Sequence, residues 1–182
     1  PERFRLSAVE QRTLAWLEGA VLGLKLCPFA RRPYDQGRIR LAVSEAREPE
    51  AVLADLSREL THLDHDPAVE TTLLITPWAL ADFLDYNDFL DPVDALLAEH
   101  GGGGVYQVAS FHPRYQFAGT APDDVENYSN RAPYPILHIL REDSLERALA
   151  DYPDAEAIPE RNIATLDRLG ADHLRALFER WS

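Results

Sequence analysis

The sequence predicts an α/β fold in which a small mixed sheet of about four strands is flanked by helices. Short apolar runs, some with strict alternation, separate longer segments whose apolar residues recur every three or four positions. Strands that alternate with helices along a chain are typical of layered α/β folds. The 182 residues contain no repeat, low-complexity segment or linker, so we expect a single domain over residues 1–182.

Composition excludes several classes of function. The net charge of -13 argues against nucleic-acid binding, because phosphate backbones are bound by clustered lysine and arginine. No apolar run approaches the roughly 20 residues of a membrane span, and the first residues lack the apolar core of a signal peptide. We therefore expect a cytoplasmic protein with neither nucleic-acid nor membrane partners. A single cysteine rules out an internal disulfide framework and a cysteine-rich zinc site.

The first element is expected to be a helix that begins after Ser7. Ser7 and Glu10 have the spacing of a capping box. Apolar residues then recur at helical steps, and Pro28 sets the end of the helix.

Cys27 follows this helix, between Lys25 and the pair Arg31 and Arg32. Nearby cations would favour the thiolate and a functional role, whereas the alternative is a small buried apolar residue. Because Cys27 precedes the first strand, we expect it at the amino edge of the sheet. That position weakens any pairing of Cys27 with His112, which would lie at the opposite edge.

The middle of the chain alternates between strands and helices. Strands are expected at residues 38–44 and 71–76, and a helix starts at Pro49, since proline is well tolerated at the first helical position. We expect two helices over residues 80–90 and 92–99, with Asp91 as the cap of the second. The aspartates repeated every three residues here are then caps and solvated surface rather than metal ligands. Gly101 to Gly104 follow as a helix end.

Two further strands, residues 105–110 and 135–141, bracket a long connector, and three short helices follow. We expect the last strand to run antiparallel to the one before it, with the first three strands parallel in direction. A connector this long is uncommon in a compact domain unless it is functional, and its aromatic residues and prolines argue against disorder.

The connector therefore provides the candidate site. His112 ends a strand and precedes a proline, and His138 lies in the next strand, so either could act as a general acid or base. Tyr115 and Tyr134 could donate hydrogen bonds to developing charge.

Asn130 and Arg131 place an amide and a guanidinium together, and Arg141 or Arg114 could add a second positive charge. The arginine fork matches carboxylates and phosphates, which suggests a small anionic substrate. Alternatively, Arg131 holds the loop closed by pairing with Asp123 or Asp124.

A single divalent transition metal is a further candidate. His112 and His138 could supply two imidazoles, with Glu142, Asp123 or Asp124 as the carboxylate of a facial triad. No compact ligand spacing supports this arrangement.

Several motif blocks resemble an uncharacterised family of bacterial proteins over almost the whole chain. These blocks read LCPFA, NDFLD, ASFHPRYQFAGTAPDD, NRAPYPILHILRE and IPERNIATL. The resemblance implies that the following residues lie in the family's motif blocks: Cys27, His112, Asn130, Arg131, His138, Arg141 and Glu142. It strengthens the case for a functional role of Cys27. It implies no reaction.

Three hypotheses follow. The first is a small enzyme that acts on an anionic metabolite through a histidine-centred site in residues 111–142. The second is an enzyme that depends on the Cys27 thiol, and the third is a non-catalytic module that binds a ligand.

Overall fold

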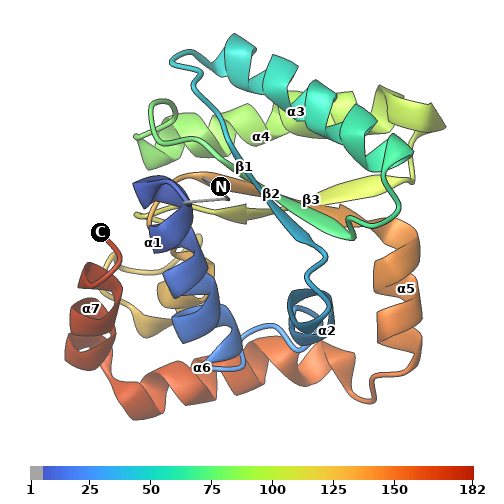
Figure 1. The fold of residues 1–182 in the computed structure, drawn as a ribbon. Coiled ribbons are helices and arrows are strands. Elements are labelled where there is room, and N and C mark those ends of the chain that lie inside the picture. The colour runs from blue at the N-terminus through green and yellow to red at the C-terminus, as the bar shows by residue number, and fades with distance from the viewer. Residues whose placement is uncertain (1–5) are drawn as a thin grey trace, which may run out of the picture.

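The computed structural model describes residues 6–182 and has the α/β architecture that the sequence predicts. Four strands form one mixed sheet: β1 (Ile39–Val43), β2 (Thr71–Ile75), β3 (Tyr106–Phe111) and β4 (Ile136–Arg141). Helices lie on both sides of this sheet (Figure 1). The helices are α1 (Ala8–Trp16), α2 (Arg31–Asp35), α3 (Pro49–His65), α4 (Phe83–Glu99), α5 (Glu142–Ala150), α6 (Ile158–Leu169) and α7 (Ala171–Glu179).

The strand order is β1-β2-β4-β3, so the last strand inserts between the second and the third. β1 and β2 are parallel, and β4 is antiparallel to both of its neighbours. The first three strands therefore run in one direction, which confirms the expected strand directions. The register places His138 beside Leu73 on one side and Ala109 on the other.

One face of the sheet is covered by α3 and α4. The apolar stripe of α3 (Val52, Leu56, Leu60, Leu63) and residues of α4 such as Tyr86 and Phe89 pack against Leu137 and Ile139 of the central strand. Because successive strand residues point to opposite faces, these two strand residues share one side.

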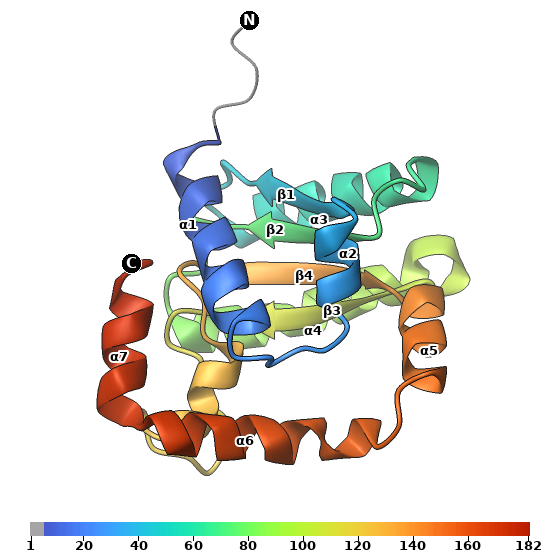
Figure 2. The same cartoon turned by 60° about the horizontal axis from the view of Figure 1, so that its bottom comes forward.

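The other face meets α1 and its continuation. The first helix passes directly into a π-helical segment, Leu17–Leu22, and both pack on Leu73, Ile75 and Ile136. Ser7 caps α1, as predicted from the sequence, because its side chain accepts a hydrogen bond from the Glu10 amide. In Figure 2, α5 descends from one end of β4, and α6 crosses beneath the sheet to reach α7.

The prediction of two helices over residues 80–99 is wrong, because α4 is continuous and contains Pro92. Asp82, not Asp91, caps this helix, and its side chain accepts a hydrogen bond from the Asp85 amide at 3.1 Å. Pro92 lacks the amide that would bond the carbonyl of Asp88, but both residues are exposed. Water can satisfy that carbonyl, so the helix continues.

The four glycines after α4 form the predicted helix end and the tight turn that leads into β3. Gly101, Gly102, Gly103 and Gly104 all have positive φ values, between 60° and 83°. This conformation is unfavourable for residues with a Cβ atom, so glycine is required through the turn.

Candidate functional site

The connector from His112 to Pro135 is held together by its own side chains. Asn127 is fully buried, and its Oδ1 accepts hydrogen bonds from the Phe117 amide at 2.9 Å and the Thr120 hydroxyl at 3.1 Å. Its Nδ2 donates to the carbonyl of Ala121 at 2.8 Å. The loop is therefore built around one central amide side chain.

His112 is also fully buried, and both of its ring nitrogens have partners. Nε2 lies 2.9 Å from the carbonyl oxygen of Leu80, and Nδ1 accepts a hydrogen bond from the Arg114 amide at 3.0 Å. A nitrogen that accepts from an amide carries no proton, so Nε2 is the protonated nitrogen and donates to Leu80. Burial lowers the pKa of this imidazole below its ordinary value. His112 is a neutral residue that joins two loops.

His138 lies on the other side of the sheet. His112 follows Phe111 and contacts Phe83 and Tyr86 of α4, whereas His138 shares its face with Leu73 and Phe111. The alternation of side chains along β3 causes this separation, since Phe111 and His112 must point to opposite faces. The two histidines do not face a common site.

The Nε2 atom of His138 is buried and has no hydrogen-bond partner in the described structure. Burial alone lowers its pKa to about 4, because the charged form loses its hydration. The imidazole is therefore neutral, with hydrogen-bonding capacity that the described residues do not use.

The guanidinium of Arg131 bonds the backbone of the connector. Nε donates to the Tyr115 carbonyl at 3.1 Å and NH2 to the Pro122 carbonyl at 2.6 Å, while the group lies 4.6 Å from the centre of the Tyr128 ring. Arg131 thus holds the loop closed through carbonyl groups rather than through Asp123 or Asp124.

The remaining connector candidates have structural contacts as well. Asn130 donates to the Ser110 carbonyl at 3.0 Å and accepts from Ser129 at 2.9 Å. Tyr115 packs edge to face against Phe117, and the hydroxyl of Tyr134 accepts a hydrogen bond from Arg12 at 3.2 Å.

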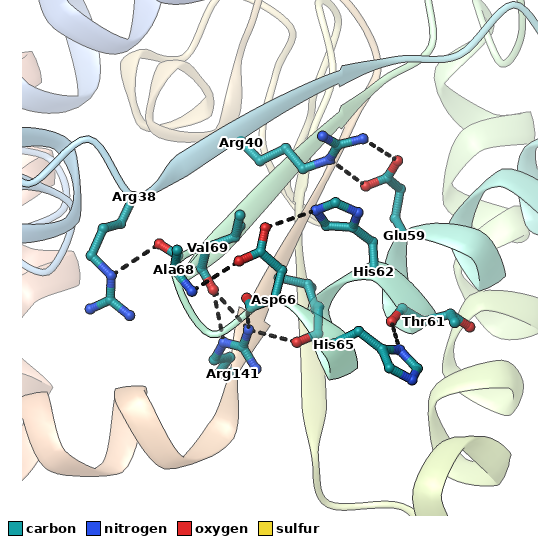
Figure 3. Close-up of polar contacts among 11 residues, drawn as sticks. Arg38, Arg40, Glu59, Thr61, His62, His65, Asp66, Ala68, Val69 and Arg141 are labelled. Carbon is teal, nitrogen blue, oxygen red and sulfur yellow. Dashed lines mark hydrogen bonds and ion pairs between the residues drawn. The ribbon is translucent and has the colours of Figure 1, made fainter.

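Arg141 lies at the far end of β4, away from Arg131. Its guanidinium donates to the carbonyls of Leu63 at 2.8 Å, Asp66 at 3.1 Å and Val69 at 2.8 Å, and so binds the turn between α3 and β2 (Figure 3). Arg38 donates to the carbonyls of the same turn. The two arginines expected to hold an anion are thus engaged at opposite ends of the strand.

The three residues proposed as metal ligands are not brought together. Glu142 follows Arg141, and its amide bonds the Val105 carbonyl at the start of β3, whereas His112 follows the end of that strand. His138 points from the opposite face. Within residues 6–182, no group of three or more histidine, cysteine, aspartate or glutamate side chains could hold a metal ion.

Cys27 lies beside the carboxyl end of β3, and the expectation that it would sit at the amino edge is wrong. The π-helical segment carries the chain across the sheet before it turns, so Cys27 lines a cavity together with Phe111 and Asn130. Burial raises the pKa of its thiol, and the nearby backbone amides of Phe29 and Ala30 only partly oppose this. Arg31 and Arg32 are exposed and do not produce the activated thiolate that the sequence suggested.

We call this space the Cys27 cavity. Its volume is about 570 Å³, within the range of ligand pockets. It lies between the segment after the π-helix, the connector and α6. The apolar lining includes Val21, Leu26, Phe111, Phe117 and Ile163, and the polar lining includes Cys27, Thr120, Glu126, Ser129, Asn130 and Asn162.

Several of these lining residues were missed in the sequence. Glu126, Asn162 and Phe111 carry no recognisable catalytic spacing, and they come together only because α6 folds back beneath the sheet. Asn162 lies within the IPERNIATL block, so that motif was the one available signal. Its Nδ2 donates to the Leu26 carbonyl at 2.9 Å and ties α6 to the residue before Cys27.

The fold and site define a mixed α/β protein with a thiol-containing cavity beside its sheet. Residues 8–176 match the family model described as "Protein of unknown function (DUF1415)", and the chain belongs to this family. This confirms the resemblance to an uncharacterised family. No match was found among curated proteins or among solved structures. Among residues 6–182, none of the helices combines the length and apolar character that a membrane span requires.

Proposed function

We propose that this protein binds a small molecule in the Cys27 cavity, and that the ligand combines an apolar body with a group that donates hydrogen bonds. The observation that carries the proposal is the cavity itself, which has the size of a ligand site and a largely apolar lining with a few convergent polar groups. Pockets of this composition are the usual sites of small-molecule recognition.

The polar groups of the lining favour a donor-bearing ligand. Glu126 is the one charged residue in the lining, and it forms no ion pair within the described chain. Asn162 uses its amide nitrogen for the Leu26 carbonyl, which leaves its oxygen as an acceptor. Hydroxyl and amine groups suit such acceptors, whereas an anion would meet a carboxylate without a neighbouring cation.

An anionic substrate has less support. That expectation depended on Arg131 and Arg141, whose guanidinium groups bond backbone carbonyls. An acid-base role for His112 is weakened for a similar reason, because both of its ring nitrogens are occupied.

A thiol-labelling experiment tests the proposal, because Cys27 is the only cysteine. The rate of alkylation by iodoacetamide is measured with and without members of a library of neutral, cationic and anionic fragments. Neutral and cationic fragments with apolar bodies are expected to slow the alkylation and raise the melting temperature, while anions do neither. Protection by anions alone would overturn the proposal.

A matched pair of variants locates the binding. Ile163→Trp places a large ring in the cavity and should abolish protection of Cys27 by the fragments. Ala164→Trp changes the exposed neighbouring position on α6, which does not line the cavity, and should leave protection intact.

A second candidate function is catalysis by the Cys27 thiol. Burial raises the pKa of the thiol, and the nearby backbone amides of Phe29 and Ala30 partly offset that effect in favour of a thiolate. A turnover assay on fragments that protect wild-type Cys27 distinguishes the two functions, since a Cys27→Ser variant retains binding but loses any thiol-dependent reaction.

A further inference from the structure

β1 is an edge strand whose outer side has no partner strand in the described chain. It pairs with β2 alone, since the strand order is β1-β2-β4-β3. In Figure 2, β1 is the uppermost strand of the sheet, and α3 lies behind it. An edge strand presents unpaired amides and carbonyls, which makes it a template for the addition of another strand.

The register with β2 identifies the backbone groups of β1 that face outward. The Ser44 amide donates to the Ile75 carbonyl at 2.8 Å, and the Arg38 carbonyl accepts from the Glu70 amide at 2.8 Å. Even-numbered residues of this stretch therefore turn their backbone groups toward β2. The alternate residues direct their amides and carbonyls away from the sheet: Ile39, Leu41 and Val43. Within residues 6–182, none of these outward groups has a hydrogen-bond partner.

β1 lacks the features that usually protect an edge strand from pairing. It contains neither proline nor glycine, and its register with β2 is continuous from Ile39 to Val43, without a bulge. Arg40 is its one charged residue. The guanidinium of Arg40 donates to Glu59 of α3 at 2.9 Å, so it lies against the helix and not across the edge.

The opposite edge of the sheet is covered in part by the connector. The side chain of Asn130 donates to the Ser110 carbonyl at 3.0 Å, and the Asn130 carbonyl accepts from the His112 amide at 3.1 Å. These bonds occupy the end of β3, and Figure 2 shows α6 below the same edge. The edge at β1 is thus the more open of the two.

An apolar groove borders the free edge on the side of α1. It has a volume of about 340 Å³ and lies between Leu14 of α1, Tyr34 of α2 and the strand residues Ile39 and Leu41. Together with Val43, these two strand residues pack on the apolar cluster of α1 but remain only partly buried. A strand added at this edge would bury more of their apolar surface.

A second copy of this chain fits the edge, because the outward groups of β1 are arranged symmetrically about Leu41. In an antiparallel pair, two opposed residues that face each other exchange both of their backbone hydrogen bonds. A two-fold axis at Leu41 pairs this residue with its own counterpart, and pairs Ile39 with Val43 of the second copy. All outward amides and carbonyls of β1 are then bonded.

The side chains favour the same register. On the side of α1 the opposed residues are all apolar, Leu41 with Leu41 and Ile39 with Val43. On the side of α3, Arg40 lies opposite Ala42 of the second copy, so like charges do not meet. A shift that pairs Ile39 with Leu41 would instead set Arg40 against Arg40, which disfavours that alternative.

We propose that β1 is the interface of a homodimer, in which two copies pair antiparallel about Leu41 and form one continuous sheet. The interface is isologous, since the same strand serves on both copies. The proposal does not depend on ligand binding in the Cys27 cavity, because Cys27 lies beside β3 at the other side of the sheet.

Disulfide cross-linking tests the register, because the chain has a single native cysteine to remove. In a Cys27→Ser background, Leu41→Cys introduces one thiol per copy at the two-fold axis. Opposed residues of this kind have Cα atoms about 5.5 Å apart, within the range of a disulfide. Mild oxidation is expected to give a covalent dimer on a denaturing gel.

Ile39→Cys and Val43→Cys in the same background are the matched controls. Each lies on β1 and faces the same side, but like residues are offset from each other across the axis. Both variants should therefore cross-link far more slowly than Leu41→Cys. Equal rates for the three variants, or no covalent dimer with Leu41→Cys, would overturn the proposed pairing.

Sedimentation equilibrium measures the association directly. Wild type is expected to be a dimer that dissociates on dilution. Leu41→Pro removes an amide that faces outward and not one that bonds β2, so it should weaken the dimer by about tenfold or more while the circular dichroism spectrum is kept. Val108→Pro makes the corresponding change on the outer side of β3 and should leave the dissociation constant unchanged.

Two results of the sedimentation experiment would contradict the homodimer. A wild-type protein that is monomeric at every concentration up to its solubility limit would overturn it, and the edge would then be open to an extended segment of a different protein. A dimer that Leu41→Pro does not weaken would overturn it as well, because such a dimer uses another surface.

Discussion

The two faces of the sheet differ in how their histidines are hydrogen-bonded. On the face covered by α3 and α4, Tyr86 donates to the Ile136 carbonyl at 2.7 Å and accepts from the Phe111 amide at 3.1 Å, and His112 uses both ring nitrogens. On the face toward α1, the Nε2 atom of His138 is buried without a partner among the described residues, and each face also holds one buried threonine hydroxyl without a partner, Thr72 on the first face and Thr71 on the second. A histidine at a strand end can therefore be a structural residue.

The largest expected effect is that of His112→Ala. The change removes a buried ring and leaves the Leu80 carbonyl and the Arg114 amide without partners, so it should lower the free energy of unfolding by about 3–5 kcal/mol. Leu80 adopts a left-handed backbone conformation, with φ of 60°, which the histidine helps to hold. Denaturant unfolding measures the loss.

His173→Ala, at an exposed position, is the control and should change stability little. A His112→Ala variant that unfolds like wild type but loses ligand binding would contradict the structural assignment of His112.

The second largest expected effect is a loss of stability at low pH that is due to His138. Its pKa is about 4 in the folded protein and 6.5 ordinarily, so the unfolded state takes up the proton first as the pH falls. Stability from this group is complete above pH 6.5 and is lost progressively down to about pH 4, by about 3 kcal/mol in total.

The free energy of unfolding is measured for wild type and His138→Leu across that pH range. The difference between the two proteins isolates the contribution of His138, because the contributions of all other groups largely cancel. Parallel stability curves for the two proteins would mean that His138 is not buried in its neutral form.

Tyr86→Phe should have an intermediate effect on the closed face. The ring remains, but the Ile136 carbonyl and the Phe111 amide lose their shared hydroxyl, at a cost of about 1–3 kcal/mol. Thermal unfolding by circular dichroism measures it. Tyr34→Phe on the opposite side is the matched control, and an equal loss in both variants would show that the faces do not differ.

Leu149→Ala should have the smallest effect, below about 0.5 kcal/mol, because α5 has no fully buried residue. Leu60→Ala in the fully packed layer should cost about 2–5 kcal/mol in the same unfolding assay. If Leu149→Ala is as destabilising as Leu60→Ala, α5 packs on the rest of the molecule as firmly as α3 does.

Most of the fold could be predicted from local patterns. Short apolar runs, alternating with polar residues in 38–44 and continuous in 71–76, predicted the four strands to within a residue or two, and Ser7, Pro49 and Gly101 to Gly104 marked helix ends. The predicted helix break at Pro92 was wrong, because the cost of a proline inside a helix depends on whether water reaches the carbonyl of Asp88. That exposure is a property of the folded surface.

The site was harder to predict, because it depends on register and on long-range packing. That His112 and His138 face opposite sides follows from pairing Ala109 with His138, and strand pairing is not encoded locally. Likewise, Arg131 and Arg141 carry the fork that suits an anion, but the loop carbonyls beside them became known only from the structure.

The packing of Trp181 against Gly19 has a consequence for folding during synthesis. A Cβ atom at Gly19 would lie 2.5 Å from the Trp181 ring, and both Trp16 and Trp181 belong to the apolar cluster beneath the sheet. The layer that begins with α1 is thus completed by a residue about 160 positions further along the chain, so it closes only after almost all of the described chain has been synthesised.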